Sequence, residues 1–144
     1  MSVEHRRAHN RWKWIALGPV LALGVAAMAV GCWAAVGNTR WESRRARLQM
    51  LQTDLRLWAE RNGHYPNDIG QVDRERGGDP VSVVERAKPE TLEYLAAGKP
   101  YDPSGKTLLF YEKRPRRYGF RHGRFIARQG IEFVPSGVAS EVPW

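Results

Sequence analysis

The sequence predicts an α+β fold: one N-terminal transmembrane helix runs into an amphipathic helix, which a small antiparallel β-sheet covers. Three observations predict it: an uncharged run over residues 14–37, a later apolar stripe at helical spacing, and short strand-like runs separated by turns. The chain has 144 residues, a net charge of +8 and one cysteine. These values argue against a multi-domain enzyme, a disulfide scaffold and a multi-span transporter.

The uncharged run has the length of a membrane span. As a helix, its 24 residues would extend about 36 Å, against a hydrocarbon core of about 30 Å. It contains no Asp, Glu, Lys, Arg or His, which argues against a proton relay, an ion path or an axial histidine ligand within the span. Four indoles near its ends predict an interfacial belt, or alternatively donors to a bound pigment, quinone or lipid: Trp12, Trp14, Trp33 and Trp41.

Small side chains recur along one stripe of the predicted span, at Ala27, Gly31 and Ala35. This spacing permits close helix–helix approach within a membrane. Two processing alternatives stay open. Residues 1–31 have the basic and apolar regions of a signal peptide, and residues 29–32 resemble a lipobox ending at Cys32.

The charges that flank the span leave its orientation weakly determined. Four basic residues lie within the tail of residues 1–13, and four more follow the span within ten positions. The number of basic residues is therefore nearly equal on the two sides, and the positive-inside rule does not select an orientation. We call the part of the chain after the span, from residue 38 on, the head. Because a short N-terminal tail before a larger head more often stays in the cytoplasm, we expect a bacterial inner-membrane protein with a cytoplasmic N-terminus and a periplasmic C-terminal domain.

The extramembrane domain is expected over residues 38–134. A helix over residues 44–62 presents an apolar stripe and stops at Gly63; the stripe consists of Leu48, Leu51, Leu55 and Trp58. An irregular loop follows to Pro80, then a short helix over residues 89–95. Asp102-Pro103-Ser104-Gly105 predicts a β-turn.

Three or four strands complete the predicted domain, covering the apolar stripe. They are expected over residues 107–112, over 118–121 with 124–128, and over 131–134. Tight turns are predicted at His122-Gly123 and Gln129-Gly130. Residues 135–144 are expected to be an extended tail.

Two short motifs follow the long helix, Asn62-Gly63-His64-Tyr65-Pro66 and Tyr101-Asp102-Pro103-Ser104-Gly105. Their order resembles the pseudopilins of type II secretion, over residues 14–134. The resemblance implies a pilin-like fold that assembles through its N-terminal helix. Pseudopilins carry a glycine cleavage site and a glutamate at the start of the helix, and residues 11–15 contain neither. A pilin-like shape used for another purpose is therefore expected.

Reactive constellations are missing from the sequence. No His or Cys spacing suits zinc, and neither a glycine-rich phosphate loop nor a nucleophile–base pair is recognisable. Asp68, Asp73 and Asp79 lack the spacing of a calcium loop. We therefore expect no enzyme activity, no cofactor and no metal.

A basic hairpin is the sharpest local feature. Its cations are Lys113, Arg114, Arg116, Arg117, Arg121 and Arg124. Alternate residues of a strand share a face, so several guanidinium groups could form a docking face for anionic lipid headgroups or an acidic protein surface. Tyr118, Phe120 and Phe125 interleave with them, as in nucleic-acid binders, but a head outside the cytoplasm rarely meets nucleic acid. The alternative is a solvated strand face.

Three functions remain from the sequence. The first is a non-catalytic accessory subunit that packs against other integral-membrane subunits of a larger complex, with an energy-transducing (photosynthetic or respiratory) assembly as a candidate. The second is a pilin-like secretion or surface component. The third is a membrane-tethered module that binds an anionic partner through the basic hairpin.

Overall fold

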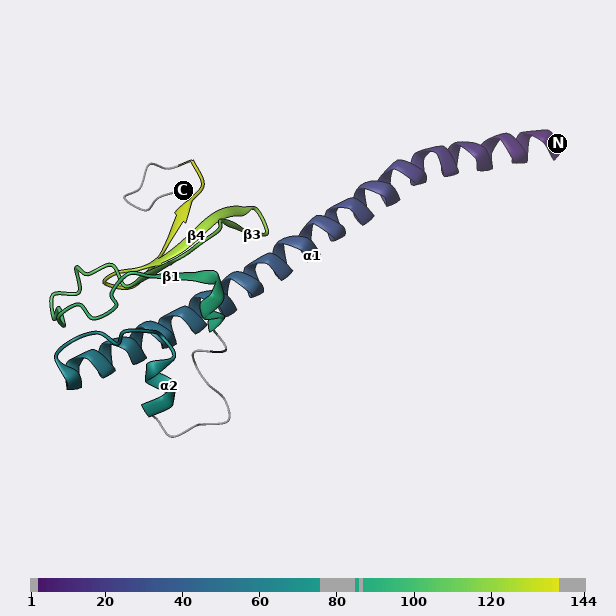
Figure 1. The fold of residues 1–144 in the computed structure, drawn as a ribbon. Helices are drawn as coiled ribbons and strands as arrows, with labels where there is room; N and C mark the ends of the chain where they lie inside the picture. The colour runs from purple at the N-terminus through teal and green to yellow at the C-terminus, as the bar shows by residue number, and fades with distance from the viewer. Residues whose placement is uncertain (1–2, 76–84, 86, 138–144) are drawn as a thin grey trace. The chain divides into compact units, whose positions relative to one another are not determined.

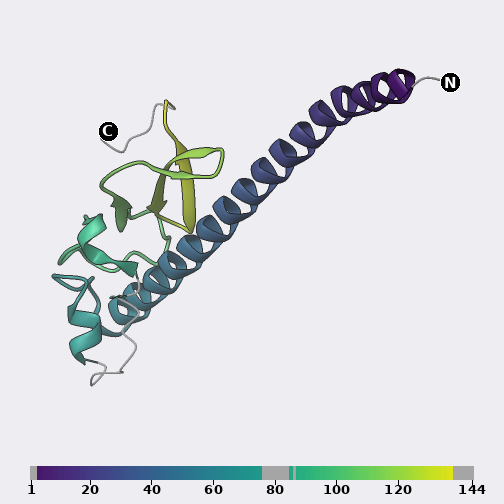
Figure 2. The same cartoon turned by 90° about the vertical axis from the view of Figure 1, so that its right-hand side faces the viewer.

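The computed structural model describes residues 3–75, 85 and 87–137, and side chains from residue 18 onward within those ranges. The chain divides into two compact units, Met1–Val36 and Gly37–Trp144. Figures 1 and 2 show a long N-terminal helix and, in the second unit, a small curled sheet. An α+β fold with one candidate membrane span follows from these elements.

Helix α1 extends over Val3–Asn62. It begins upstream of the uncharged run, and Pro19 lies inside the helix. From Gly18 on, it contains an 18-residue window with a mean hydropathy of 2.1, and it is the one helix in the described chain that is long and apolar enough to cross a membrane. It ends as predicted, because Gly63 adopts φ 75° and donates its N–H to Ala59 O at 2.8 Å.

The predicted apolar stripe is buried. Leu48, Leu51 and Leu55 are fully buried, and Trp58 is 8% exposed. They belong to one hydrophobic cluster with side chains of the sheet, among them Phe110 and Phe125. The helical spacing correctly predicted the buried face of this part of α1. The strand-like runs correctly predicted an antiparallel sheet that covers it.

The sheet has five antiparallel strands. They are β1 (Leu92–Tyr94), β2 (Phe110–Glu112), β3 (Arg116–Tyr118), β4 (Arg121–Ala127) and β5 (Ile131–Pro135). The longest strand, β4, is the centre of the sheet. Ile126 pairs with Tyr111 of β2 and with Glu132 of β5, which places β2 and β5 on opposite edges of β4. Gly123 of β4 likewise pairs with Arg116 of β3 and with Pro135 of β5, so β3 and β5 lie on opposite edges of β4. Strand β3 therefore lies along the same edge of β4 as β2.

The predicted hairpin turn at His122-Gly123 is wrong. Both residues lie inside β4, and the turn that joins β3 to β4 is Gly119-Phe120. Gly119 supplies the positive φ, 62°, that a tight hairpin turn needs. Gly123 is required for a different reason: a Cβ there would lie well inside van der Waals contact of Val134 O on the neighbouring strand.

Two further segments differ from the sequence prediction. The expected helix over residues 89–95 is a 3₁₀ turn, η1 (Pro89–Thr91), followed by β1, because pairing with β2 draws this segment into the sheet. Within the expected irregular loop, α2 (Gln71–Glu75) forms a short helix that buries Val72. The part of that loop that follows α2, residues 76–80, lies outside the described residues.

The strand bounds and the tail also need correction. The first predicted strand is shorter, starting at Phe110 instead of residue 107. Pro135 belongs to β5, and Ser136 donates its N–H to His122 O at 2.8 Å. The extended tail predicted beyond residue 137 lies outside the described residues.

The Asp102 turn is confirmed. Gly105 donates its N–H to Asp102 O at 3.1 Å and adopts φ 71°. The Asp102 carboxylate accepts hydrogen bonds from the Ser104 hydroxyl at 2.6 Å and from the N–H and hydroxyl of Thr107, both at 3.0 Å. The Ser104 hydroxyl and then the Thr107 hydroxyl hold the pKa of Asp102 at about 2.

Candidate functional site: a basic hollow in the head

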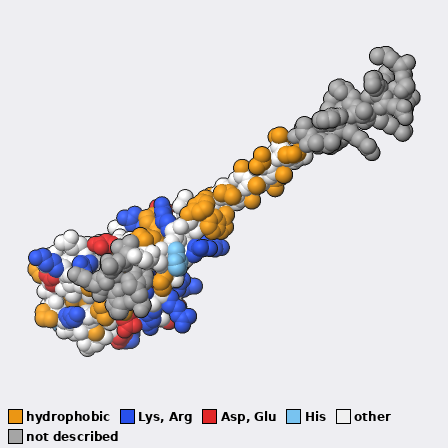
Figure 3. Space-filling view, turned by 90° about the horizontal axis from the view of Figure 1, so that it is seen from above, with side chains coloured by type: hydrophobic (Ala, Val, Ile, Leu, Met, Phe, Trp, Pro, Cys, Tyr) orange, Lys and Arg blue, Asp and Glu red, His pale blue; other side chains and the backbone are white. Residues whose placement is uncertain are grey.

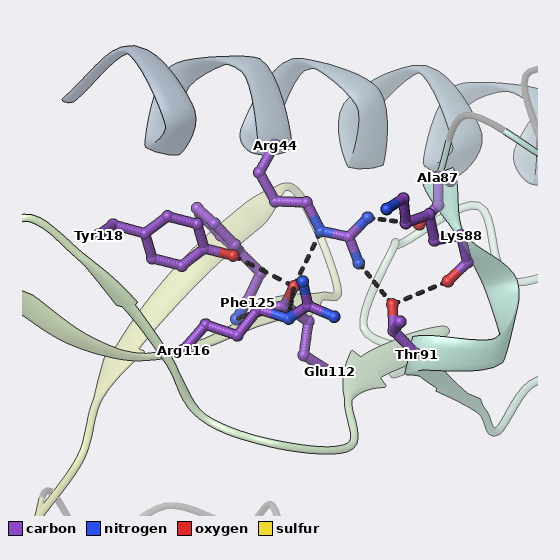
Figure 4. A network of polar contacts seen from close by, with 8 residues as sticks. All are labelled: Arg44, Ala87, Lys88, Thr91, Glu112, Arg116, Tyr118 and Phe125. Carbon is purple, nitrogen blue, oxygen red and sulfur yellow. Dashed lines mark hydrogen bonds and ion pairs between the residues drawn. The ribbon is translucent and has the colours of Figure 1, made fainter. Parts of the chain in front are cut away.

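A buried ion pair connects α1 to the sheet (Figure 4). Arg44 is 8% exposed and donates from Nε to Oε1 of the fully buried Glu112 at 2.8 Å. Its other nitrogens donate to Ala87 O and, at 2.8 Å, to Thr91 Oγ1. One guanidinium therefore holds together the helix, the end of β2 and the segment that enters β1.

Glu112 is satisfied by several donors besides Arg44. The Tyr118 hydroxyl lies 3.3 Å from Oε1, and the Phe125 N–H donates to Oε2 at 3.1 Å. Arg116 Nε lies 3.8 Å from Oε1. A buried carboxylate is tolerated only with such partners. Burial, and secondarily the negative charge of Glu112, raises the pKa of Tyr118 to about 12, so this phenol remains a donor at neutral pH.

A hollow of about 410 Å³ opens beside this pair. Its lining comes from α1, from the residue before η1 and from β3. We call it the basic hollow; its residues are Thr39, Arg40, Ser43, Arg44, Arg47, Lys88, Arg116, Arg117 and Tyr118. Six of these nine side chains are cationic and none is acidic. The carboxylate of Glu112 beneath them accepts hydrogen bonds from Arg44, Tyr118 and Phe125 and forms a longer ion pair with Arg116.

Lys88 has a strained backbone at the edge of this hollow. It is the one non-glycine residue with positive φ in the described chain, at φ 55° and ψ 70°. Its carbonyl accepts the N–H of Thr91 at 3.0 Å and the Thr91 hydroxyl at 2.7 Å. Strain of this kind persists where the surrounding bonds enforce it, and it concentrates at binding sites.

The six cations of the predicted docking face separate in the structure. Arg116 and Arg117 line the basic hollow. Lys113 is exposed and lies 4.0 Å from the carboxylate of Glu93, and Arg114 is exposed.

The other two arginines of the predicted face have aromatic neighbours. Arg121 is exposed and places its guanidinium carbon 4.4 Å from the ring centroid of Trp41. Arg124 is 2% exposed, with its guanidinium carbon 5.7 Å from the Tyr111 ring. Its place on an exposed docking face was therefore wrong, because this part of β4 is covered on both faces.

The predicted tryptophan belt is described only in part. Trp33 is 45% exposed. Trp41 packs on the core of the head, with its ring centroid 5.8 Å from that of Phe125 and 6.5 Å from that of Phe133. Trp41 therefore packs against the sheet, and its expected place in an interfacial belt stays a prediction. The side chains of Trp12 and Trp14 lie outside the described residues.

The small-residue stripe is open. Ala27, Gly31 and Ala35 are all exposed, and a Cβ built on Gly31 would meet nothing within 4 Å. The space that close helix–helix packing requires is therefore available along this stripe.

The turn between β3 and β4 lies against the helix where the uncharged run ends. Gly37, the last residue of that run, is buried, and a Cβ there would overlap the backbone of Gly119. The next residue of the turn, Phe120, is 73% exposed, the highest value among the exposed large apolar side chains that the structure describes.

Sequence reasoning missed the helical contribution to the hollow. Arg40, Arg44 and Arg47 belong to the basic residues that follow the predicted span, and their spacing of four and then three residues places them on one helical face. That spacing could have indicated a basic face. The contribution of Lys88 had no sequence signal, since it depends on the fold of the segment before β1.

Six cationic side chains around one hollow suit the binding of an anion. Within the described residues, no cluster of three or more His, Cys, Asp or Glu side chains could hold a metal ion. Compared with family models, curated proteins and solved structures, the chain gives no match.

Proposed function

We propose that this chain is a non-catalytic, single-span subunit of a larger integral-membrane complex. The supporting observation is the exposure of α1 in the first unit: eight large apolar side chains between Val20 and Val36 are 45–70% exposed (Figure 3). Apolar surface this continuous is unfavourable in water and needs lipid or other helices around it. We propose that the N-terminus lies in the cytoplasm and the head on the periplasmic side of a bacterial inner membrane, because the N-terminal tail is much shorter than the head.

Partner helices are proposed to pack on the stripe of Ala27, Gly31 and Ala35. In lipid, helices associate through close packing and not through a hydrophobic driving force, so small side chains mark the contact face. The basic hairpin and hollow then offer polar contacts outside the hydrocarbon region.

The experiment is gentle detergent extraction of the full chain, followed by mass spectrometry of what co-purifies. The stripe variant Ala27→Leu/Ala35→Leu is expected to stay in the membrane fraction and to lose its partners. The matched control, Ala22→Leu/Ala29→Leu, adds the same volume to the opposite face of the helix at about 100° per residue, and it should keep them. Elution of the wild-type chain as an ordered monomer without partners would refute the proposal.

A pilin-like component is the second candidate. It is favoured by the order of elements: one long helix, a bridge between His64 and Pro100, the Asp102 turn, and an antiparallel sheet. Mass spectrometry of the mature N-terminus distinguishes the two. Cleavage before an apolar residue supports the pilin-like component, and an intact N-terminus counts against it.

A further inference from the structure

The basic hollow holds cations with little opposing charge. Arg40, Arg47 and Arg117 are exposed and form no ion pair within the described residues. Arg44 is committed to Glu112, which neutralises it. The remaining cations would repel one another unless an anion joins them, so the hollow is preorganised for an anionic group.

The lining matches the chemistry of a phosphate group. A guanidinium group presents several N–H donors in one plane, and two phosphate oxygens can accept hydrogen bonds from them at once. The hydroxyl-bearing side chains of Thr39 and Ser43 also line the hollow. A volume of about 410 Å³ exceeds what one inorganic phosphate fills. A phosphate that carries a further polar group fits the space better.

The position of the hollow along the chain selects the source of that phosphate. Arg40 is the first charged residue after the uncharged run that ends at Gly37. If that run spans the hydrocarbon core, the next helical turn lies in the headgroup layer, where lipid phosphates are. The exposed Phe120, in the turn that contacts Gly37, adds an apolar side chain at the same level of the helix.

We propose that the basic hollow binds the phosphate headgroup of an anionic phospholipid at the membrane surface. This inference rests on the proposed membrane anchor. Arg40, Arg47, Lys88 and Arg117 supply the charge, and Arg44 with Glu112 forms a neutral floor that holds the helix against the sheet. The bound lipid would fix the head at the bilayer surface and set its distance from the span.

The test uses the full chain in a non-ionic detergent. Purified protein is mixed with dioleoyl phosphatidylglycerol or with dioleoyl phosphatidylcholine, and retained lipid is counted by mass spectrometry of the intact protein. We expect retention of phosphatidylglycerol in preference to phosphatidylcholine. Equal retention of the two lipids by the wild-type chain would overturn the inference.

The hollow variant is Arg47→Gln/Arg117→Gln. Because both side chains are exposed, it should fold as the wild type does, with the same near-ultraviolet circular dichroism. Phosphatidylglycerol should bind roughly 30-fold more weakly, since each basic side chain at a membrane surface contributes about a factor of five. The variant Arg47→Lys/Arg117→Lys keeps both charges but loses the planar guanidinium donors, so it should bind phosphatidylglycerol more tightly than the glutamine variant and less tightly than the wild type.

The matched control is Lys99→Gln/Lys106→Gln, which removes two exposed charges outside the hollow. It should bind as the wild type does, and an equal loss in both variants would assign the effect to overall charge and overturn the inference. Displacement of the lipid by millimolar inorganic phosphate would show a free-phosphate site and would also overturn it. Resistance of the wild-type chain to carbonate extraction tests the anchor separately, so the two proposals fail in different measurements.

Discussion

Replacing Glu112 by glutamine tests how the helix and sheet are held together. Glutamine keeps the shape but removes the charge, and its amide nitrogen would face donors: Arg44 Nε, the Tyr118 hydroxyl or the Phe125 N–H. The change leaves a guanidinium that is 8% exposed without its counter-charge. Breaking a buried pair from one side costs about 3–5 kcal/mol of unfolding free energy, and we expect Glu112→Gln to fall in that range.

The reverse change, Arg44→Met, should cost about as much. It leaves Glu112 with the Tyr118 hydroxyl, the Phe125 N–H and Arg116 nearby. It also removes the hydrogen bonds to Ala87 O and Thr91 Oγ1, each of which contributes about 1 kcal/mol. The double variant Arg44→Met/Glu112→Gln should cost less than the sum of the two, by about 1–3 kcal/mol.

The assay is urea unfolding of the full chain in micelles, followed by near-ultraviolet circular dichroism of the head. Glu93→Gln is the matched control, because its carboxylate lies 4.0 Å from an exposed Lys113, and its loss should cost less than about 1 kcal/mol. A cost for Glu112→Gln equal to that of Glu93→Gln would refute the reasoning. So would strictly additive costs in the double variant.

Three other perturbations test the packing and the Asp102 turn. Gly37→Ala forces a methyl group into the backbone of Gly119 and should destabilise the head by about 1–3 kcal/mol in the same urea assay. Leu55→Ala removes a fully buried side chain and should cost about 2–5 kcal/mol; a cost below 1 kcal/mol would contradict its place in the core. Asp102 has a pKa lowered from 3.8 to about 2 by the Ser104 hydroxyl, so its bonds contribute stability that is complete above about pH 4 and is lost as the pH falls through 2. Its carboxyl carbon shift should therefore titrate near pH 2, and a midpoint near 4 would disprove the effect.

Periodicity predicted the parts of the fold that depend on local spacing. The stripe of Leu48, Leu51, Leu55 and Trp58 identified the buried face, and Gly63 marked the end of the helix, because both signals act within one or two turns of chain. The Asp102 turn was predicted for the same reason. Each of these features needs only neighbouring residues to form.

Several features that depend on distant residues were not predicted, although the cover of the stripe by the sheet was. Gly123 looked like a turn residue, but its lack of a side chain serves the close approach of β5. Leu92 and Tyr94 looked helical because Pro89 precedes them, and pairing with β2 overrode that preference. The hollow joins residues 39–47 to residues 88 and 116–118, so only the folded chain brings it together.

The bonds between α1 and the sheet span most of the head, and this affects the order of events during synthesis. Arg44 and Glu112 are 68 residues apart, and Gln52 donates to Arg128 O across 76 residues. Leu48, Leu51 and Leu55 therefore leave the ribosome long before the strands that cover them. Until β4 and β5 have been made, the nascent chain exposes a second apolar surface beyond its uncharged run, and this surface is where a chaperone would be needed.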